Sequence, residues 1–200
     1  MSLVQAFICE QFVLVCGDTR AVFSNGEISD NFPKVKKIDN AIIGMTGNIQ
    51  DNAYVFQDFM NEDFSLKNLN KSFSYEFIRK TAILRFKELK QKRFSIELHS
   101  VICGINRNGI SEGTFISSNV NRPDVQTATP EDIQDVRIIN CGKDEHLNNL
   151  YSLLRKENLT SFKVKTFKQL FNKVLEEGRN IDDSINSLPT FEYLFNSQEV

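Results

Sequence analysis

The chain has 200 residues, of which 40% are hydrophobic and 25% charged, and its formal net charge is −2. A chain of this length can bury a sizeable core as one domain, 1–200, without disulfides or a structural metal. Basic and acidic residues are interspersed and no apolar run approaches the roughly 18 residues of a membrane span, so we expect neither a nucleic-acid partner nor a membrane partner.

Two apolar runs open the chain at residues 3–9 (LVQAFIC) and 12–17 (FVLVCG), separated only by Glu10 and Gln11. This spacing predicts a β-hairpin. Nearly every position in both runs is apolar, which indicates a sheet that is covered on both faces. The following segment 25–33 contains Gly, Asn, Asp and Pro and is expected to form a turn and loop.

Short strands are then predicted at residues 34–38 and 41–45, followed by a Thr46-Gly47 turn and a helix over about 48–61. Asn48 is the expected N-cap of this helix. Glycine at the turn permits a positive φ, and free N–H groups at a helix start can bind an oxyanion. Gly47 is therefore a candidate for stabilising a developing negative charge.

A second helix is predicted over about 72–93. Its apolar stripe consists of Tyr75, Ile78, Ala82, Phe86 and Leu89. Strands are predicted next at 96–105, 109–117, about 125–129 and 136–140, then helices at 144–156 and 164–178, and a last strand at 191–195. The first of these later helices is expected to bury Leu147, Leu150, Tyr151 and Leu154. This order fits an α+β fold, a four-layer αββα sandwich of two stacked antiparallel sheets flanked by helices.

The chain contains four cysteines, Cys9, Cys16, Cys103 and Cys141. They lie in apolar runs without CxxC spacing, and no segment resembles a secretory signal, so we expect reduced core thiols in a cytoplasmic protein. Whether Cys9 and Cys16 face each other across the hairpin stays open. His99 and His146 have no partners at metal-site spacing, so we expect both to be structural, with no metal or cofactor bound.

Three short motifs end or begin at the predicted strand ends: VLVCGD ends at Asp18, KVKKI begins at Lys34, and GMTG ends at Gly47. With the element order, these residues resemble the N-terminal-nucleophile (Ntn) hydrolases, and within them the proteasome β subunits and a related bacterial peptidase that works under a ring ATPase. The resemblance covers most of the chain and is strongest over residues 2–60. Placing Asp18 and Lys34 on the family positions puts Ser2, without a gap, on the nucleophile position.

The resemblance implies a threonine- or serine-type hydrolase of peptide or amide bonds. An α-amino group with an unperturbed pKa near 8 can accept the proton of the terminal Ser2 hydroxyl. Lys34 would favour the neutral amine, and Asp18 would hold Lys34 in place. The N–H group of Gly47 would bind the oxyanion.

Further family positions fall on Cys141, Asp183 and Asn186. The chain departs from the family in having serine at position 2, cysteine at 141 and asparagine at 186. Met1 would block the amino group of Ser2 until it is removed, which a small second residue permits. If residues 1–3 replace a different native start, the nucleophile lies outside this sequence.

Two functions follow from these residues. The first is a peptidase that acts on a peptide or protein substrate within a ring of identical subunits, with a possible ATPase partner. The second is a catalytically inactive proteasome-like subunit used for assembly or binding. In structural terms alone, Asp18 and Lys34 could form a solvated ion pair, Gly47 could serve only its turn, and Cys141 could be a buried apolar residue.

Overall fold

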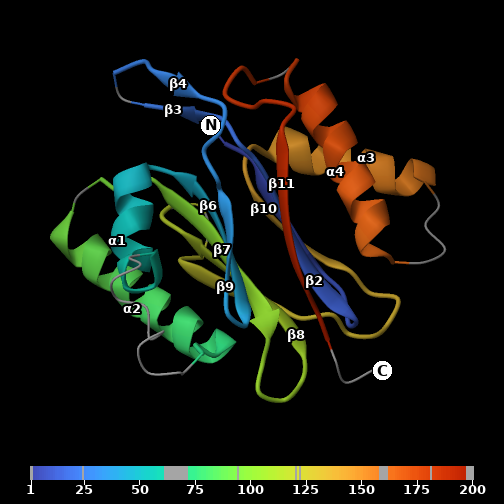
Figure 1. Ribbon diagram of the computed structural model, residues 1–200, viewed down its shortest axis with the longest axis horizontal. Coiled ribbons are helices and arrows are strands. Elements are labelled where there is room, and N and C mark those ends of the chain that lie inside the picture. Colours follow the sequence, from blue (N-terminus) through green and yellow to red (C-terminus); the bar gives the residue numbers. More distant parts are fainter. Residues whose placement is uncertain are drawn as a thin grey trace.

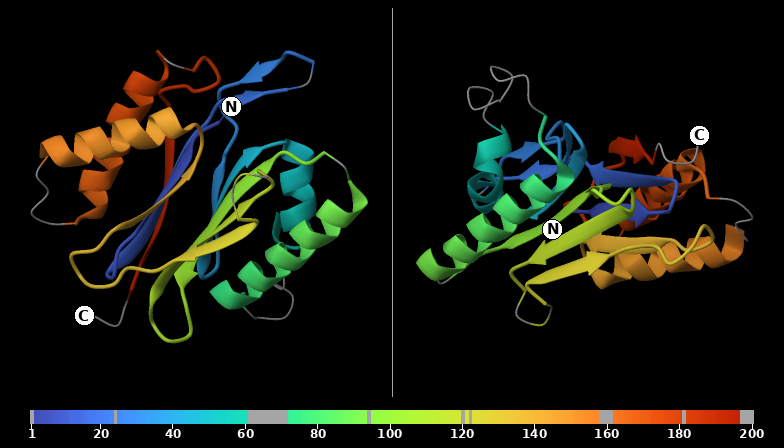
Figure 2. Two further views of the ribbon diagram at one scale, coloured as in Figure 1. Left: turned by 180° about the vertical axis from the view of Figure 1, so that it is seen from behind. Right: turned by 90° about the horizontal axis from the view of Figure 1, so that it is seen from below.

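Two β-sheets lie face to face in the computed structural model, with α1 and α2 outside one sheet and α3 and α4 outside the other (Figure 1). The views from behind and from below in Figure 2 show the same layers. The structure describes residues 2–23, 25–60, 72–93, 95–119, 121, 123–157, 162–180 and 182–196. The predicted α+β sandwich of two antiparallel sheets flanked by helices is therefore confirmed.

The first sheet has the strand order β10-β1-β2-β11, and each neighbouring pair is antiparallel. Its strands are β1 (Val4–Ile8), β2 (Phe12–Asp18), β10 (Arg137–Cys141) and β11 (Pro189–Phe195). Every residue of β1 and β2 is buried, as the apolar runs predicted. Cys16 pairs with Gln5 rather than with Cys9, and all four cysteines are buried thiols.

The second sheet has the order β5-β6-β7-β8-β9, again antiparallel throughout. Its strands are β5 (Val35–Ile38), β6 (Ala41–Gly47), β7 (Leu98–Ile105), β8 (Ser111–Ser117) and β9 (Val125–Ala128). Thr46 and Gly47 were expected in a turn, but they pair with His99 and Leu98 and so complete β6. The helix therefore starts directly at the end of a strand.

A small ribbon, β3 (Ala21–Val22) with β4 (Ile28–Ser29), projects from the sandwich close to the start of the chain (Figure 1). The predicted turn and loop over residues 25–33 is confirmed except at Ile28–Ser29, which form the second strand of this ribbon. Gly26 at the tip of the ribbon has φ +83°, which lets the chain reverse so that the N–H of Phe23 bonds to the carbonyl of Glu27.

The helices are α1 (Ile49–Met60), α2 (Tyr75–Lys92), α3 (Asp144–Glu157) and α4 (Val164–Gly178). Asn48 caps α1, because its Oδ1 accepts the N–H groups of Gln50 and Asp51. The apolar stripe predicted for α2 is buried as expected. Position 61, the predicted end of the first helix, lies outside the described residues.

The stripe predicted for α3 was partly wrong. This helix buries His146, Leu150 and Leu153, whereas Tyr151 is 43% exposed. The reason is the packing of α3 against α4, which turns His146 toward Gly178 at the end of α4. Among the described residues, no helix combines the length and the apolar character that crossing a bilayer requires.

Alternate side chains of the segment formed by Leu3 and β1 enter different cores. Leu3 and Phe7 pack with α3 and α4, whereas Val4 and Ala6 pack between the two sheets. A third core lies between the second sheet and helices α1 and α2. The start of the chain is therefore fixed in the middle of the sandwich from residue 3 onward.

Candidate active site

Asp18 and Lys34 form a buried ion pair. Both carboxylate oxygens of Asp18 lie 2.7 Å from Nζ of Lys34, and the two side chains are 0% and 3% exposed, respectively. Asp18 ends β2 of the first sheet, while Lys34 immediately precedes β5 of the second. Each sheet thus supplies one charge, and the pair is not the solvated ion pair that the sequence also allowed.

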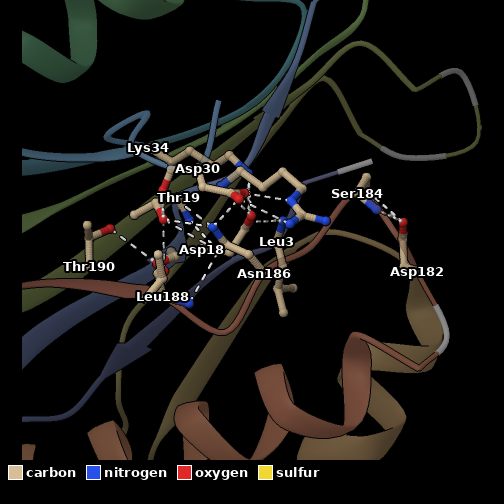
Figure 3. A network of polar contacts seen from close by, with 12 residues as sticks. Leu3, Asp18, Thr19, Asp30, Lys34, Asp182, Ser184, Asn186, Leu188 and Thr190 are labelled. Atoms are coloured by element: carbon tan, nitrogen blue, oxygen red, sulfur yellow. Dashed lines mark hydrogen bonds and ion pairs between the residues drawn. The ribbon is translucent and has the colours of Figure 1, made fainter. Parts of the chain in front are cut away.

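The same carboxylate holds the beginning of the chain (Figure 3). Oδ1 of Asp18 accepts a hydrogen bond from the backbone N–H of Leu3 at 2.8 Å, and Oδ2 accepts one from the N–H of Arg20 at 3.0 Å. The N–H of Leu3 belongs to the peptide bond that follows Ser2. The Lys34 ammonium and the Ser2–Leu3 peptide therefore meet at one oxygen atom.

Burial is the main influence on the charge of Lys34. It lowers the pKa of the ammonium, while the carboxylate of Asp18 and, more weakly, that of Asp182 favour the protonated form. A lysine whose pKa is lowered gives up its proton at a lower pH than an exposed lysine does. Such a group beside a terminal residue is suited to controlling where a proton resides.

Ser2 is half-buried and lies where two pockets adjoin. The inner pocket has a volume of about 130 Å³ and the outer one about 700 Å³, and both are lined by Ser2 and Gly47. The inner pocket is mainly apolar, with walls that include Ala21, Val22, Phe32, Met45, Ile49 and Ala53. The outer pocket adds the polar side chains of Arg20, Asn48, Gln50, Glu97 and Ser184.

Gly47 occupies a position that excludes any side chain. Its φ is +88°, and a Cβ atom there would lie 2.4 Å from the carbonyl oxygen of Glu97. The next residue, Asn48, is the N-cap of α1, so the positive end of the helix dipole lies at the pocket wall. This arrangement is suited to binding a negatively charged oxygen.

Three further predicted site residues lie around this centre and do not line the two pockets beside Ser2. Asp183 is exposed, and its backbone carbonyl accepts a hydrogen bond from Arg20 at 2.9 Å. Asn186 is buried, and its Oδ1 accepts the N–H of Thr19 at 3.2 Å, which supports the end of β2. Cys141 is buried at the end of β10, opposite Val4.

Sequence reasoning missed Asp182 and Ser184. Ser184 lines the outer pocket with Ser2, and its hydroxyl donates to Oδ1 of Asp182 at 2.6 Å. Oδ2 of the same carboxylate lies 2.9 Å from Nζ of Lys143. Although burial opposes ionisation, the hydrogen bonds from Ser184 and Lys143 lower the pKa of Asp182 to about 2. The Asp-x-Ser spacing, typical of an Asx turn, was the available signal.

Metal ligation finds no support in the part of the chain that the structure describes, where no three His, Cys, Asp or Glu side chains gather into a possible ligand set.

No protein-family model matches the sequence, and no curated protein matches it either. Solved structures do match, among them eukaryotic HslV from Trypanosoma brucei, with a TM-score of 0.60 and 14% sequence identity over 96% of this chain and 99% of the HslV chain. This likeness shows that the chain has the Ntn-hydrolase fold of HslV, as the sequence resemblance predicted.

Proposed function

We propose that this chain, which has the fold of HslV, is an Ntn-type hydrolase of peptide or amide bonds with Ser2 as its nucleophile. The proposal depends on one observation. Oδ1 of Asp18 accepts a hydrogen bond from Nζ of Lys34 and another from the backbone N–H that follows Ser2. The α-amino group can take the proton of a terminal hydroxyl only while the amine is neutral. A fixed cation beside the terminal residue favours that neutral form.

The proposed reaction begins once Met1 has been removed. The Ser2 oxygen attacks the substrate carbonyl while the α-amino group takes its proton, and the resulting oxyanion binds the N–H of Gly47. Lys34 keeps the amine neutral by charge repulsion, and Asp18 holds Lys34 in place. The amine then passes the proton to the leaving nitrogen, and water hydrolyses the ester that remains on Ser2.

The N-terminal residue provides the decisive test. Intact mass of protein made from the native gene should lack Met1, and an inhibitor that reacts with N-terminal hydroxyls should add its mass to Ser2. Ser2→Ala should lose the adduct and reduce kcat by roughly 10⁴-fold or more, because the nucleophile is gone. Ser2→Thr is the matched control and should keep both. Retained Met1 without an adduct would favour the inactive assembly or binding subunit.

The inner pocket supports a preference for apolar side chains in the substrate. Ala53, on α1, faces this pocket and is exposed, so a larger side chain there can fill the pocket without disturbing the core. Ala53→Phe should lower kcat/KM about 10- to 200-fold for peptides with a large apolar residue at the cleavage site, and much less for alanine peptides. Leu84→Phe, at a 61% exposed position on α2, is the control. Equal losses for both peptide classes would contradict the assignment.

The same resemblance supports a ring of identical subunits as the working form, with a ring ATPase as a possible partner. The ribbon β3–β4 offers exposed apolar side chains for such contacts, since Val22 and Ile28 are 54% and 58% exposed. Val22 also lines both pockets, so a neighbouring subunit at this ribbon would border the cleft.

A further inference from the structure

His146 is a buried histidine that has no role in the mechanism above. It lies in the first turn of α3 and is 1% exposed. Neither of its ring nitrogens has a hydrogen-bond partner among the described residues. Buried polar atoms without partners are rare in folded proteins, so this ring calls for a physical explanation.

A carboxylate lies just beyond bonding distance of the ring. Nε2 of His146 is 4.0 Å from Oδ2 of Asp182, which is too long for a hydrogen bond. On its other side the ring is confined by α4, where a Cβ added to Gly178 would lie 3.2 Å from Nδ1. The charged groups that act on the ring are Asp182, Lys143, Glu145 and Asp18.

Asp182 connects this ring to the proposed site. Its Oδ1 receives both the hydroxyl and the N–H of Ser184, at 2.6 and 3.0 Å, and Ser184 lines the outer pocket with Ser2. Its charge also raises the pKa of Lys34. If a change at His146 moves or neutralises the Asp182 carboxylate, it therefore alters two things: the position of Ser184 at the edge of the outer pocket and the pKa of Lys34.

We infer that His146 is a positioning residue that controls the Asp182–Ser184 contact according to pH. When the ring is neutral, the Asp182 carboxylate keeps its hydrogen bonds from Ser184 and its ion pair with Lys143. The protonated ring is attracted to Oδ2 of Asp182, 4.0 Å away, competes with Lys143 for it and draws the carboxylate from Ser184. The effect on turnover rests on the proposed function, whereas the coupling between His146 and Asp182 does not.

The direction of the pH effect follows from burial. Burial lowers the pKa of His146 below its ordinary value of 6.5, despite the opposing influence of Asp182, and the start of a helix also disfavours a positive charge. As pH falls, the unfolded chain binds a proton at this residue near 6.5, whereas the folded chain binds it only at a lower pH. Stability from this group is complete above 6.5 and is lost as pH falls toward the folded pKa. Asp182, with a pKa of about 2, stays charged in this window.

Histidine titration followed by NMR tests the coupling directly. The chain has two histidines, and His99, whose Nδ1 lies 2.9 Å from Ser117 Oγ, is the internal reference. His146 should titrate below 6.5, and Asp182→Asn should lower its pKa further, because a favourable charge is removed. The His99 titration should not move. An unchanged His146 pKa in Asp182→Asn would overturn the inference.

The pH profile of kcat/KM tests the effect on the cleft. As pH falls from 7.5 through the folded pKa of His146, which the NMR titration measures, His146→Gln should lose activity about 3-fold less than the wild type, because a neutral amide cannot take up the proton. Protonation of the Ser2 amine affects both proteins equally. If kcat/KM of His146→Gln and of the wild type fell equally at low pH, the inferred control of the Asp182–Ser184 contact by His146 would be overturned. If no turnover is found at any pH while the NMR shift is present, the proposed function fails and the His146–Asp182 coupling stands.

Discussion

Lys34→Ala is expected to abolish turnover and to lower the free energy of unfolding by about 3–5 kcal/mol. In the sequence, Lys34 lies at a predicted strand end, where it could also form a solvated ion pair with Asp18. The structure instead places Lys34 in the interior, 3% exposed, as the partner of an Asp18 carboxylate that is fully buried. Removing the ammonium leaves that carboxylate without a counter-charge in a low-dielectric site, so the folded state should be strongly destabilised.

Urea unfolding of matched variants separates stability from catalysis. Lys90 and Asp124 form an ion pair of similar geometry, at 2.7 and 2.8 Å, but their side chains are 40% and 53% exposed. Lys90→Ala should cost at most about 1 kcal/mol. The double variant Asp18→Asn with Lys34→Met removes both buried charges and should regain much of the stability without regaining turnover. If Lys34→Ala and Lys90→Ala lowered the free energy of unfolding equally, the Asp18–Lys34 pair would have to be accessible to water.

Gly47→Ala is expected to destabilise the protein by several kcal/mol and to abolish turnover. The substitution forces a side chain into a conformation at φ +88° and places its Cβ 2.4 Å from the Glu97 carbonyl oxygen. The first effect alone costs about 1–2 kcal/mol. The second adds to it because the clash is with backbone, which cannot rotate away, so the end of β6 must shift and carry with it the N–H that we propose binds the oxyanion.

Gly26→Ala is the control for the first effect, the cost of placing a side chain on a residue with positive φ. Gly26 has φ +83°, yet apart from its two chain neighbours no atom of the described residues lies within 4 Å of the position its Cβ would take. Gly26→Ala should lower the free energy of unfolding, measured by urea denaturation, by about 1–2 kcal/mol and should retain turnover. If both alanine variants unfold at the same urea concentration, the contact between Gly47 and Glu97 relaxes freely and the strict need for glycine is disproved.

The sequence predicted the order of the layers because long elements carry strong periodicity. The apolar stripe from Tyr75 to Leu89 predicted a helix covered on one face, and the nearly continuous apolar runs of β1 and β2 predicted strands covered on both faces. The ribbon β3–β4 escaped prediction because each of its strands has only two residues, too few to show alternation. The α3 stripe was misassigned because a polar residue, His146, takes a buried place.

The site was predictable only in part for a similar reason. The approach of Asp18 to Lys34 followed from their places at strand ends and from the family resemblance. Which of two adjacent carboxylates, Asp182 or Asp183, turns inward depends on a turn that hydrogen bonds from Ser184 define, and local composition does not specify that choice. The full burial of the Asp18–Lys34 pair likewise depends on how closely the two sheets pack, which is a property of the whole fold.

The strand order of the first sheet has a consequence for biosynthesis. Asp18 is made long before β11, the strand that borders its own and whose Pro189 lies opposite it in the ladder. Contacts between residues so distant along the chain form late in folding. A nascent polypeptide therefore cannot complete the environment of Asp18 until β11 has left the ribosome and paired with β2, so the proposed hydrolase becomes competent only after that strand has been made.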